Sequence, residues 1–323
     1  MTRFIQTPEQ LVFEDGVFPS ILSNDMSASN MSECLAWLEK HKENIESELA
    51  RSGAVLFRGF PIKEAEEFDA FSKAFAYSSF TYKDSLSNAV RINYTERVFT
   101  ANEAPKEMEI FLHHEMAQTP QSPSKLFFFC HSAAESGGAT PICRSDHLFD
   151  AIQMRKPELA KEFIDKGIRY TTYMPAENNS DSGQGRSWKD TLSVASIADA
   201  EAKLQDLAYS WQWLEDGTLE ATSPVLPAVI EHHGSKIFYN QLIAAFMGWK
   251  GVRENPKAAL QFGDGSPLYA DDLQDISNWA EEFTYDLNWQ AGDVVLIDNH
   301  RTMHGRRPYS GDKKRLVLVA LAA

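Results

Sequence analysis

The sequence predicts a mainly β fold with flanking helices, in which two sheets pack as a sandwich or jelly roll. The order of elements is two helices, then strands interrupted by a long mixed insert, then two closing strands. Strands and helices do not alternate regularly, which argues against a doubly wound parallel sheet. Double-sheet folds accommodate the observed order better.

Helical spacing of apolar residues and strong helix formers predict two early helices, over 33–50 and 63–76. Between them, "AVLFRGF" (54–60) predicts a short strand. Five later apolar segments predict strands, at 89–94, 124–133, 236–240, 292–299 and 315–322. Three further helical patterns lie between these strands, at 146–155, 157–166 and 270–283.

We find no internal repeat and no linker that would divide the chain, so we expect a single domain over 1–323. It would have a helical N-terminal region and a lid or insert around 145–290. Within the insert, "PAENNSDSGQGRS" (175–187) is polar and rich in Gly, Ser and Asn, which is typical of a loop. Loops of this length are commonly lids or binding loops, and we expect 175–190 to close over a substrate.

The composition excludes several classes of protein. With 43% hydrophobic and 11% aromatic residues the chain can bury a full core, so disorder is excluded. The formal charge of −15 would repel nucleic acid, and no dense Lys/Arg cluster reverses it. Three cysteines without CxxC spacing indicate no disulfide framework. The first residues lack the apolar run of a signal peptide, and "LVLVALA" is too short to span a bilayer. We therefore expect a cytoplasmic protein with no membrane partner.

The segment "FLHHEMAQTP" (111–120) places two histidines beside a glutamate. In an extended chain, side chains two residues apart point to the same face. His113 and Glu115 would therefore converge, while His114 would point away. One imidazole and one carboxylate are two ligands of a metal site, and a third must come from elsewhere.

The segment "GDVVLIDNHRTMHGRRPYSGDKKRL" supplies that third ligand. An apolar strand is followed by His304 and then by an arginine that opens the last strand. With His304 the set becomes two histidines and one carboxylate, which occupy one face of an octahedral iron and leave three positions open. Zinc prefers a closed tetrahedron, and no fourth ligand is evident.

Two other histidine pairs are less suited to the site. His300 and His304 have the spacing of a helical zinc pair, but Arg301 stands where a zincin has glutamate. "EHHG" (231–234) is typical of a solvated turn before a strand.

Taken together, these motifs resemble the TauD/TfdA family of Fe(II)- and 2-oxoglutarate-dependent dioxygenases. The sequence is most similar to the clavaminate synthase-like and SyrP-like branch. The resemblance runs from "GAVLFRGF" to the C-terminus, and its motifs are "RVFTANE" (97–103), "HHEMAQTPQSPSKLFFFC" (113–130), "GGATPI" (137–142), "FGDG" (262–265) and "DNHRTMHGRRPYSGDKKRL" (298–316). The family implies a double-stranded β-helix (jelly roll) core with iron between its two sheets.

The resemblance also implies roles for particular residues. His113, Glu115 and His304 match the iron ligands, with Glu in place of the more usual Asp. Thr140 and Arg315, which follows His304 by eleven residues, match the contacts to the distal end of 2-oxoglutarate. A guanidinium suits a carboxylate because it offers two parallel donors.

The implied cofactors are Fe(II), 2-oxoglutarate as cosubstrate, and O₂. The implied reaction decarboxylates 2-oxoglutarate to succinate and CO₂ and oxidises an unactivated C–H bond. Related halogenases replace the ligand carboxylate with a small residue, whereas Glu115 is present here, so hydroxylation is expected; desaturation and cyclisation remain open. Arg186 and Lys189 are candidate substrate contacts.

We expect an amino-acid-like substrate of secondary metabolism, either free or tethered to a carrier protein. In sulfonate-oxidising relatives a second arginine lies four residues beyond the first, and here that position is Val319. The net charge of −15 opposes docking of an acidic carrier. The alternatives are a dioxygenase of another small acid, such as a sulfonate, and a non-catalytic metal-binding jelly roll. A zinc hydrolase would leave Arg315 and "GGATPI" unexplained. The oligomeric state stays open.

Overall fold

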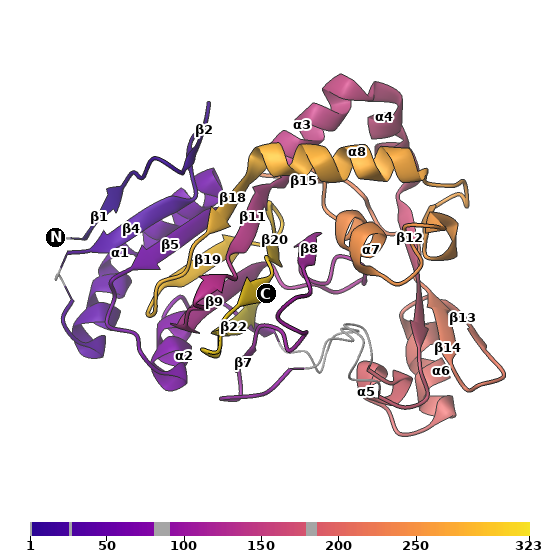
Figure 1. The fold of residues 1–323 in the computed structure, drawn as a ribbon, viewed down its shortest axis with the longest axis horizontal. Coiled ribbons are helices and arrows are strands. Elements are labelled where there is room, and N and C mark those ends of the chain that lie inside the picture. Colours follow the sequence, from indigo (N-terminus) through magenta and orange to yellow (C-terminus); the bar gives the residue numbers. More distant parts are fainter. Residues whose placement is uncertain (1, 26–27, 81–90, 179–185) are drawn as a thin grey trace.

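Two β-sheets face each other in the computed structural model, beside a helical insert and a smaller sheet (Figure 1). The structure describes residues 2–25, 28–80, 91–178 and 186–323. Within these ranges the chain is mostly β, as the sequence predicts, with eight α-helices. Five of these helices match the predicted ones, and three within the insert, at 188–192, 197–206 and 242–248, were not predicted.

The larger sheet has eight strands in the order β1-β4-β5-β19-β9-β22-β6, with β7 also paired to β22. Its strands are antiparallel except for the pair β4–β5. Their bounds are β1 Thr2–Ile5, β4 Ser20–Asn24, β5 Ala54–Arg58, β6 Ser79–Phe80, β7 Val98–Thr100, β9 Lys125–Ser132, β19 Val294–Asp298 and β22 Leu316–Ala322.

The facing sheet has four antiparallel strands in the order β18-β11-β20-β8. Their bounds are β8 Ile110–His113, β11 Thr140–Arg144, β18 Thr284–Leu287 and β20 Thr302–Arg306. Three of these strands carry residues that the sequence assigns to the metal and cosubstrate sites, so this sheet positions the site.

Alternation along the strands of the larger sheet divides the core into two layers. In β5, Ala54 and Leu56 pack towards the facing sheet. Val55 and Phe57 pack on the opposite side, against helices α1 (Met31–Ser52) and α2 (Ala65–Lys73). All four side chains are fully buried. Because both faces of the strand are covered, it is continuously apolar in sequence.

The join between α1 and β5 depends on Gly53. Its φ of 84° is left-handed, and its N–H donates to the carbonyl of Leu49, which ends the helix. A Cβ at this position would lie 2.5 Å from Oγ1 of Thr302. Glycine therefore both ends the helix and lets β20 approach it.

The insert between β11 and β18 contains most of the helices and extends away from the two main sheets (Figure 1). It includes a four-stranded sheet of order β13-β14-β12-β17. Its elements are α3 Ser145–Arg155, α4 Pro157–Lys166, β12 Ile168–Met174, α5 Trp188–Leu192, α6 Ile197–Asp206, β13 Ser210–Trp213, β14 Leu219–Thr222, β15 Ile230–His232, β16 Ser235–Ile237, α7 Leu242–Gly248, η2 Pro256–Ala258, β17 Leu260–Phe262, α8 Ala270–Ala280 and η3 Glu281–Phe283. Two further strand pairs lie outside it, the hairpin of β2 Leu11–Phe13 with β3 Gly16–Phe18, and the two-stranded sheet of β10 Ser136–Gly137 with β21 Tyr309–Ser310.

Most predicted elements are confirmed within two or three residues, but the strand predicted at 89–94 is not. Residues 89–90 lie outside the described ranges, and 91–94 make an isolated bridge from Asn93 to Phe99. A tight turn explains the difference, since Tyr94 N–H donates to Val98 and Thr100 N–H donates back to Ile92. The strand predicted at 236–240 is also shorter, because β16 ends at Ile237.

The loop predicted at 175–187 is described only in part, since residues 179–185 lie outside the described ranges. Ser187, the last residue of this loop, caps α5 by accepting a hydrogen bond from the backbone N–H of Asp190. Across the parts of the chain that the structure describes, no helix has the length and apolar character needed to cross a membrane.

Candidate active site

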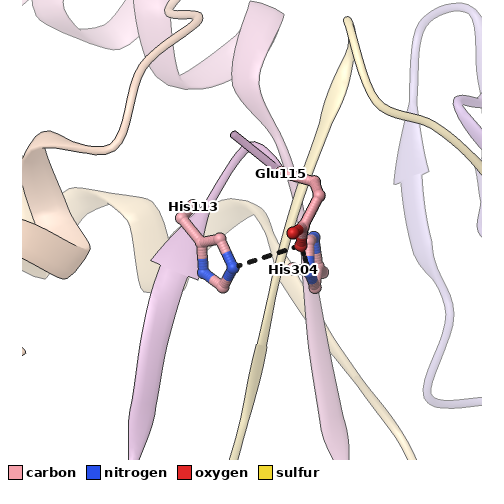
Figure 2. A group of neighbouring side chains, drawn as sticks. All are labelled: His113, Glu115 and His304. Atoms are coloured by element: carbon pink, nitrogen blue, oxygen red, sulfur yellow. Dashed lines mark ion pairs between the residues drawn. The ribbon is translucent and has the colours of Figure 1, made fainter. Parts of the chain in front are cut away.

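Two histidines meet across the strand pair β8–β20. His113 ends β8, and the antiparallel register places it directly opposite His304 in β20. Their ring centroids are 4.3 Å apart, and both rings point to the same side of the sheet (Figure 2). Two histidines far apart in the sequence thus form one pair of imidazoles.

Glu115 completes the group two residues beyond His113. Its Oε2 lies 3.4 Å from Nε2 of His304 and 3.9 Å from Nε2 of His113 (Figure 2). The backbone of Glu115 is held by Asn299, whose Oδ1 accepts from its N–H (2.7 Å) and whose Nδ2 donates to its carbonyl (3.0 Å). The amide of Asn299 therefore fixes the point from which the carboxylate extends.

His114 points away from this group and is fully buried. Its Nδ1 bonds to the carbonyl oxygen of Asn299, and its Nε2 lies 2.8 Å from Oγ of Ser145. Burial lowers the pKa of His114 to about 3, so its ring is neutral at pH 7. Its partners are structural, and none of its nitrogens faces Glu115.

The electrostatics of the three residues suit a divalent metal. Burial, followed by the nearby charge of His304, lowers the pKa of His113 to about 4. Its Nδ1 donates to the carbonyl of Phe111 (2.8 Å), which leaves the lone pair of Nε2 free for a metal. Burial alone would raise the pKa of Glu115, but the charge of Arg91 and a hydrogen bond from His304 hold it well below its ordinary range. The group therefore offers two imidazoles and one carboxylate, the donor set of a facial iron site.

Arg91 is a site residue that the sequence did not reveal. Its Nη2 lies 3.3 Å from Oε1 of Glu115, and its Nη1 donates to the carbonyls of Thr100 and Ala101. The two carboxylate oxygens thus have different partners, since Oε1 takes Arg91 and Oε2 faces the histidines. No local motif marks Arg91, because its relation to Glu115 arises only in the folded chain.

The three ligand side chains line a cavity together with Arg91, Thr140 and Arg315. Nε of Arg315 donates to the carbonyl of Gly138 (2.9 Å), and Nη2 lies 3.5 Å from Oγ1 of Thr140. Gly138 has a φ of 72°, and a Cβ there would lie 3.0 Å from Cδ of Arg315. The glycines of "GGATPI" therefore make room for the arginine.

The guanidinium of Arg315 lacks a carboxylate partner among the described residues. Burial, with the charge of Arg306 added, lowers its pKa to about 10. A buried cation without a counter-charge is costly and indicates that an anion belongs beside it. This observation fits a dicarboxylate whose one end would reach a metal at His113, Glu115 and His304.

Arg306, two residues beyond His304, is a second residue that sequence reasoning missed. It is 4% exposed, lines the same cavity, and donates to the carbonyls of Ala104 (3.0 Å), Pro105 (2.6 Å) and Met108 (2.7 Å). It ties the loop before β8 against β20. The only signal in the sequence is its place in "HGRR".

The predicted substrate contacts lie outside the residues that line this cavity. Nη2 of Arg186 donates to the carbonyl of Asp190 (2.7 Å). Burial lowers the pKa of Arg186, and the charge of Arg91 contributes. Lys189 is exposed, with its Nζ 5.3 Å from the centre of the Trp188 ring.

Comparison with known proteins gives a consistent result. The family model "Taurine catabolism dioxygenase TauD, TfdA family" matches residues 22–321. A clavaminate synthase-like protein of Arabidopsis thaliana is 36% identical over 321 residues, which cover 97% of this chain and 96% of the relative. The dapdiamide synthesis protein DdaC of Enterobacter agglomerans is 30% identical over 291 residues, covering 86% of this chain and 84% of that protein.

Among solved structures, AAD-2 in complex with Mn(II) and N-oxalylglycine superposes with a TM-score of 0.56 at 15% identity. The match covers 100% of this chain and 97% of AAD-2. At this level of identity the similarity shows a shared fold.

Proposed function

Because this chain belongs to the TauD/TfdA family, it is a dioxygenase, and we propose that it uses Fe(II), 2-oxoglutarate and O₂ to hydroxylate an amino-acid-like substrate. The observation that carries this proposal is the cavity in which three metal-competent side chains adjoin a partly buried arginine without a carboxylate partner among the described residues. A metal site alone would not need the arginine.

His113, Glu115 and His304 would hold the iron. Their ligand atoms lie within 4.8 Å of one another, and the carboxylate contributes a single oxygen, Oε2, on the side of the histidines. When bound, Fe(II) with 2-oxoglutarate supplies the oxidative decarboxylation that drives C–H oxidation. Retention of Glu115 supports hydroxylation over halogenation.

Arg315 and Thr140 would bind the distal carboxylate of 2-oxoglutarate. The fork of Arg315 offers two donors in the plane of a carboxylate, which a lysine could not match. Thr140 is held in place by the indole N–H of Trp289, which donates to its Oγ1 (2.9 Å). The apolar side chains of Phe128 and Val317 complete this wall and help to exclude water. AAD-2 in complex with Mn(II) and N-oxalylglycine supports the binding of a metal and a dicarboxylate in this fold.

Two observations support the proposed substrate class, one from Val319 and one from a relative. Val319 is 1% exposed and packs between the sheets, so it offers no donor to a sulfonate. DdaC is named for dapdiamide synthesis, which favours an amino-acid-like substrate. Arg186 and Lys189, at the end of the polar loop of the insert, remain the proposed substrate contacts.

We further propose a jelly-roll arrangement of the two facing sheets within a single catalytic domain over 1–323, which works in the cytoplasm. The region 145–290 would act as its lid or insert. The partner is a small molecule, either free or carrier-tethered.

The test is a coupled assay on protein loaded with Fe(II) under anaerobic conditions. Free amino acids, carrier-bound amino acids and taurine are each supplied with 2-oxoglutarate and O₂, and succinate and the oxidised product are measured by mass spectrometry. We expect product one oxygen atom heavier than an amino acid, in a 1:1 ratio to succinate, and none from Glu115→Ala protein. Taurine oxidation without turnover of any amino acid would contradict the substrate class, and iron binding without any succinate release would contradict catalysis.

A further inference from the structure

A second group of metal-competent side chains lies where the hairpin β15–β16 meets the end of β19. His232 and His233 come from the hairpin, and Asp298 is the last residue of β19. Their ligand atoms lie within 4.8 Å of one another. The sequence predicted "EHHG" to be a solvated turn; the structure places its histidines against a buried carboxylate.

The distances lie near those of a ligand set, and without a metal Nε2 of His232 hydrogen-bonds to Asp298. Nε2 of His232 lies 2.9 Å and Nε2 of His233 lies 3.9 Å from the same oxygen, Oδ2 of Asp298. Two ligands bound about 2.0–2.1 Å from a tetrahedral zinc lie roughly 3.4 Å apart, a value that the two distances bracket. Small side-chain rotations would therefore admit an ion.

Asp298 is arranged to present one oxygen to the histidines. Its side chain is 1% exposed, its Oδ1 accepts from the backbone N–H of His300 (3.1 Å), and Lys125 Nζ lies 3.4 Å from the same oxygen. The lysine and backbone N–H thus satisfy Oδ1, and Oδ2 is left to the imidazoles.

The conformation of His233 adds a second observation. It is the first residue of a two-residue hairpin turn, with a φ of 49°, and Gly234 follows with a φ of 79°. Such a turn favours Asn, Asp or Gly at its first position, because other side chains are strained there. The strained residue here is a histidine whose Nε2 faces Asp298.

A third group of possible ligands, Asp15, Asp146 and His147, has carboxylates that are already paired with arginines. Arg144 donates to both Asp15 and Asp146, and Arg301 also lies within 4.0 Å of both carboxylates. Two arginines already neutralise its two acids, which leaves no net attraction for a cation. The group at Asp298 also has one cation, Lys125, for its one acid, but it contains two imidazoles, which bind a metal as neutral ligands.

We propose that His232, His233 and Asp298 form a second divalent-metal site, separate from the cavity at His113 and selective for zinc-class ions that imidazole binds well. The site is open, since three protein ligands leave a fourth position for water. It joins the insert to the strand end that precedes Asn299, the residue that holds the backbone of Glu115.

The experiment is equilibrium dialysis of metal-stripped protein against Zn²⁺, with the metal counted by mass spectrometry. We expect two zinc ions per wild-type chain, one in His113→Ala, one in His233→Asn, and none in the double variant. His233→Asn is the informative change, because asparagine suits the left-handed turn while removing the imidazole. Zn²⁺ should also raise the Tm of His113→Ala protein but leave that of the double variant unchanged.

His131→Ala is the matched control. This histidine lies 3.5 Å from a single carboxylate, that of Glu64, and its variant should keep two zinc ions. A zinc count in His233→Asn equal to that of wild type, or no zinc in His113→Ala, would overturn the proposal. The dialysis does not depend on turnover, so its failure is separable from failure of the proposed oxygenase activity.

Discussion

Arg91 and Glu115 form an ion pair inside the cavity, in which Nη2 of Arg91 lies 3.3 Å from Oε1 of Glu115 while Oε2 faces both histidines. Both side chains are nearly buried. A bound metal and Arg91 would therefore be two cations that share one carboxylate, each on its own oxygen.

Replacing Arg91 with Met should destabilise the metal-free protein more than the metal-loaded protein. Without Arg91 the buried carboxylate loses a counter-charge, at a cost of about 3–5 kcal/mol, which a bound metal would offset. Denaturant unfolding with and without Mn²⁺ measures this difference. Arg91→Lys should recover part of the loss. Equal stability of Arg91→Met and wild type in the absence of metal would show that the ion pair contributes nothing.

His113→Ala and His114→Ala should have different consequences. Loss of His113 removes one of three ligands, and we expect more than the roughly 10- to 100-fold drop in metal affinity that follows loss of an outer partner. Loss of His114 removes buried hydrogen bonds and leaves a cavity, which should cost about 2–4 kcal/mol of stability while metal binding and activity below the melting temperature persist. Calorimetry with Mn²⁺ and thermal melts separate the two effects. Metal binding lost in His114→Ala but kept in His113→Ala would reverse these roles.

Arg315→Ala should impair cosubstrate binding and spare the metal. The lost ion pair is buried, so we expect KM for 2-oxoglutarate to rise by about 30- to 1,000-fold, equivalent to roughly 2–4 kcal/mol. Arg315→Lys keeps the positive charge but loses the paired donors of the guanidinium. Its KM for 2-oxoglutarate should therefore lie between those of wild type and Arg315→Ala. Steady-state kinetics with 2-oxoglutarate varied is the measurement. An unchanged KM would place the cosubstrate tail elsewhere.

Arg186→Ala should raise KM for the primary substrate by about tenfold or more, as expected for a lost charged hydrogen bond, and leave KM for 2-oxoglutarate unchanged. Lys189→Ala should raise KM for the primary substrate less, by about fivefold at most, because an exposed charge contributes roughly 0–1 kcal/mol. Measuring both constants for both variants tests the two proposed contacts. If neither variant alters KM for the substrate, the lid does not bind it through these residues.

Acid stability should depend on Asp146. Burial alone would raise the pKa of Asp146, but hydrogen bonds from Arg144 and the charges of Arg144 and Arg301 lower it well below its ordinary 3.8. A carboxylate whose folded pKa is depressed stabilises the protein fully above its unfolded pKa, and this contribution is lost as the pH falls further. At pH 7 the free energy of unfolding of Asp146→Asn should therefore be about 3–5 kcal/mol below that of wild type. Between pH 4 and pH 2 the variant should lose less of its free energy of unfolding than wild type does. Urea unfolding across that range would show parallel pH profiles if the pair were unimportant.

The sequence by itself determined the local elements and the reaction class. Periodicity located α1, β5, β9, β19 and β22, because apolar spacing reports which face of an element is buried. The two-residue spacing of His113 and Glu115 indicated their convergence, and the structure shows both with His304 in one cavity. Arg315 and Thr140 came from family motifs and lie in the same cavity.

Tertiary structure alone decided which distant residues meet. Arg91 reaches Glu115, Asn299 clamps the Glu115 backbone, and the histidines at 232–233 face Asp298. None of these pairs is encoded by local spacing, since each depends on strand register and on the path of a loop between sheets. The same reason explains the error at 91–94, where hydrogen bonds to Val98 and Thr100 replace the strand that β propensity favours. Sequence periodicity reports what a segment buries, whereas the partner against which it is buried is chosen by the whole fold.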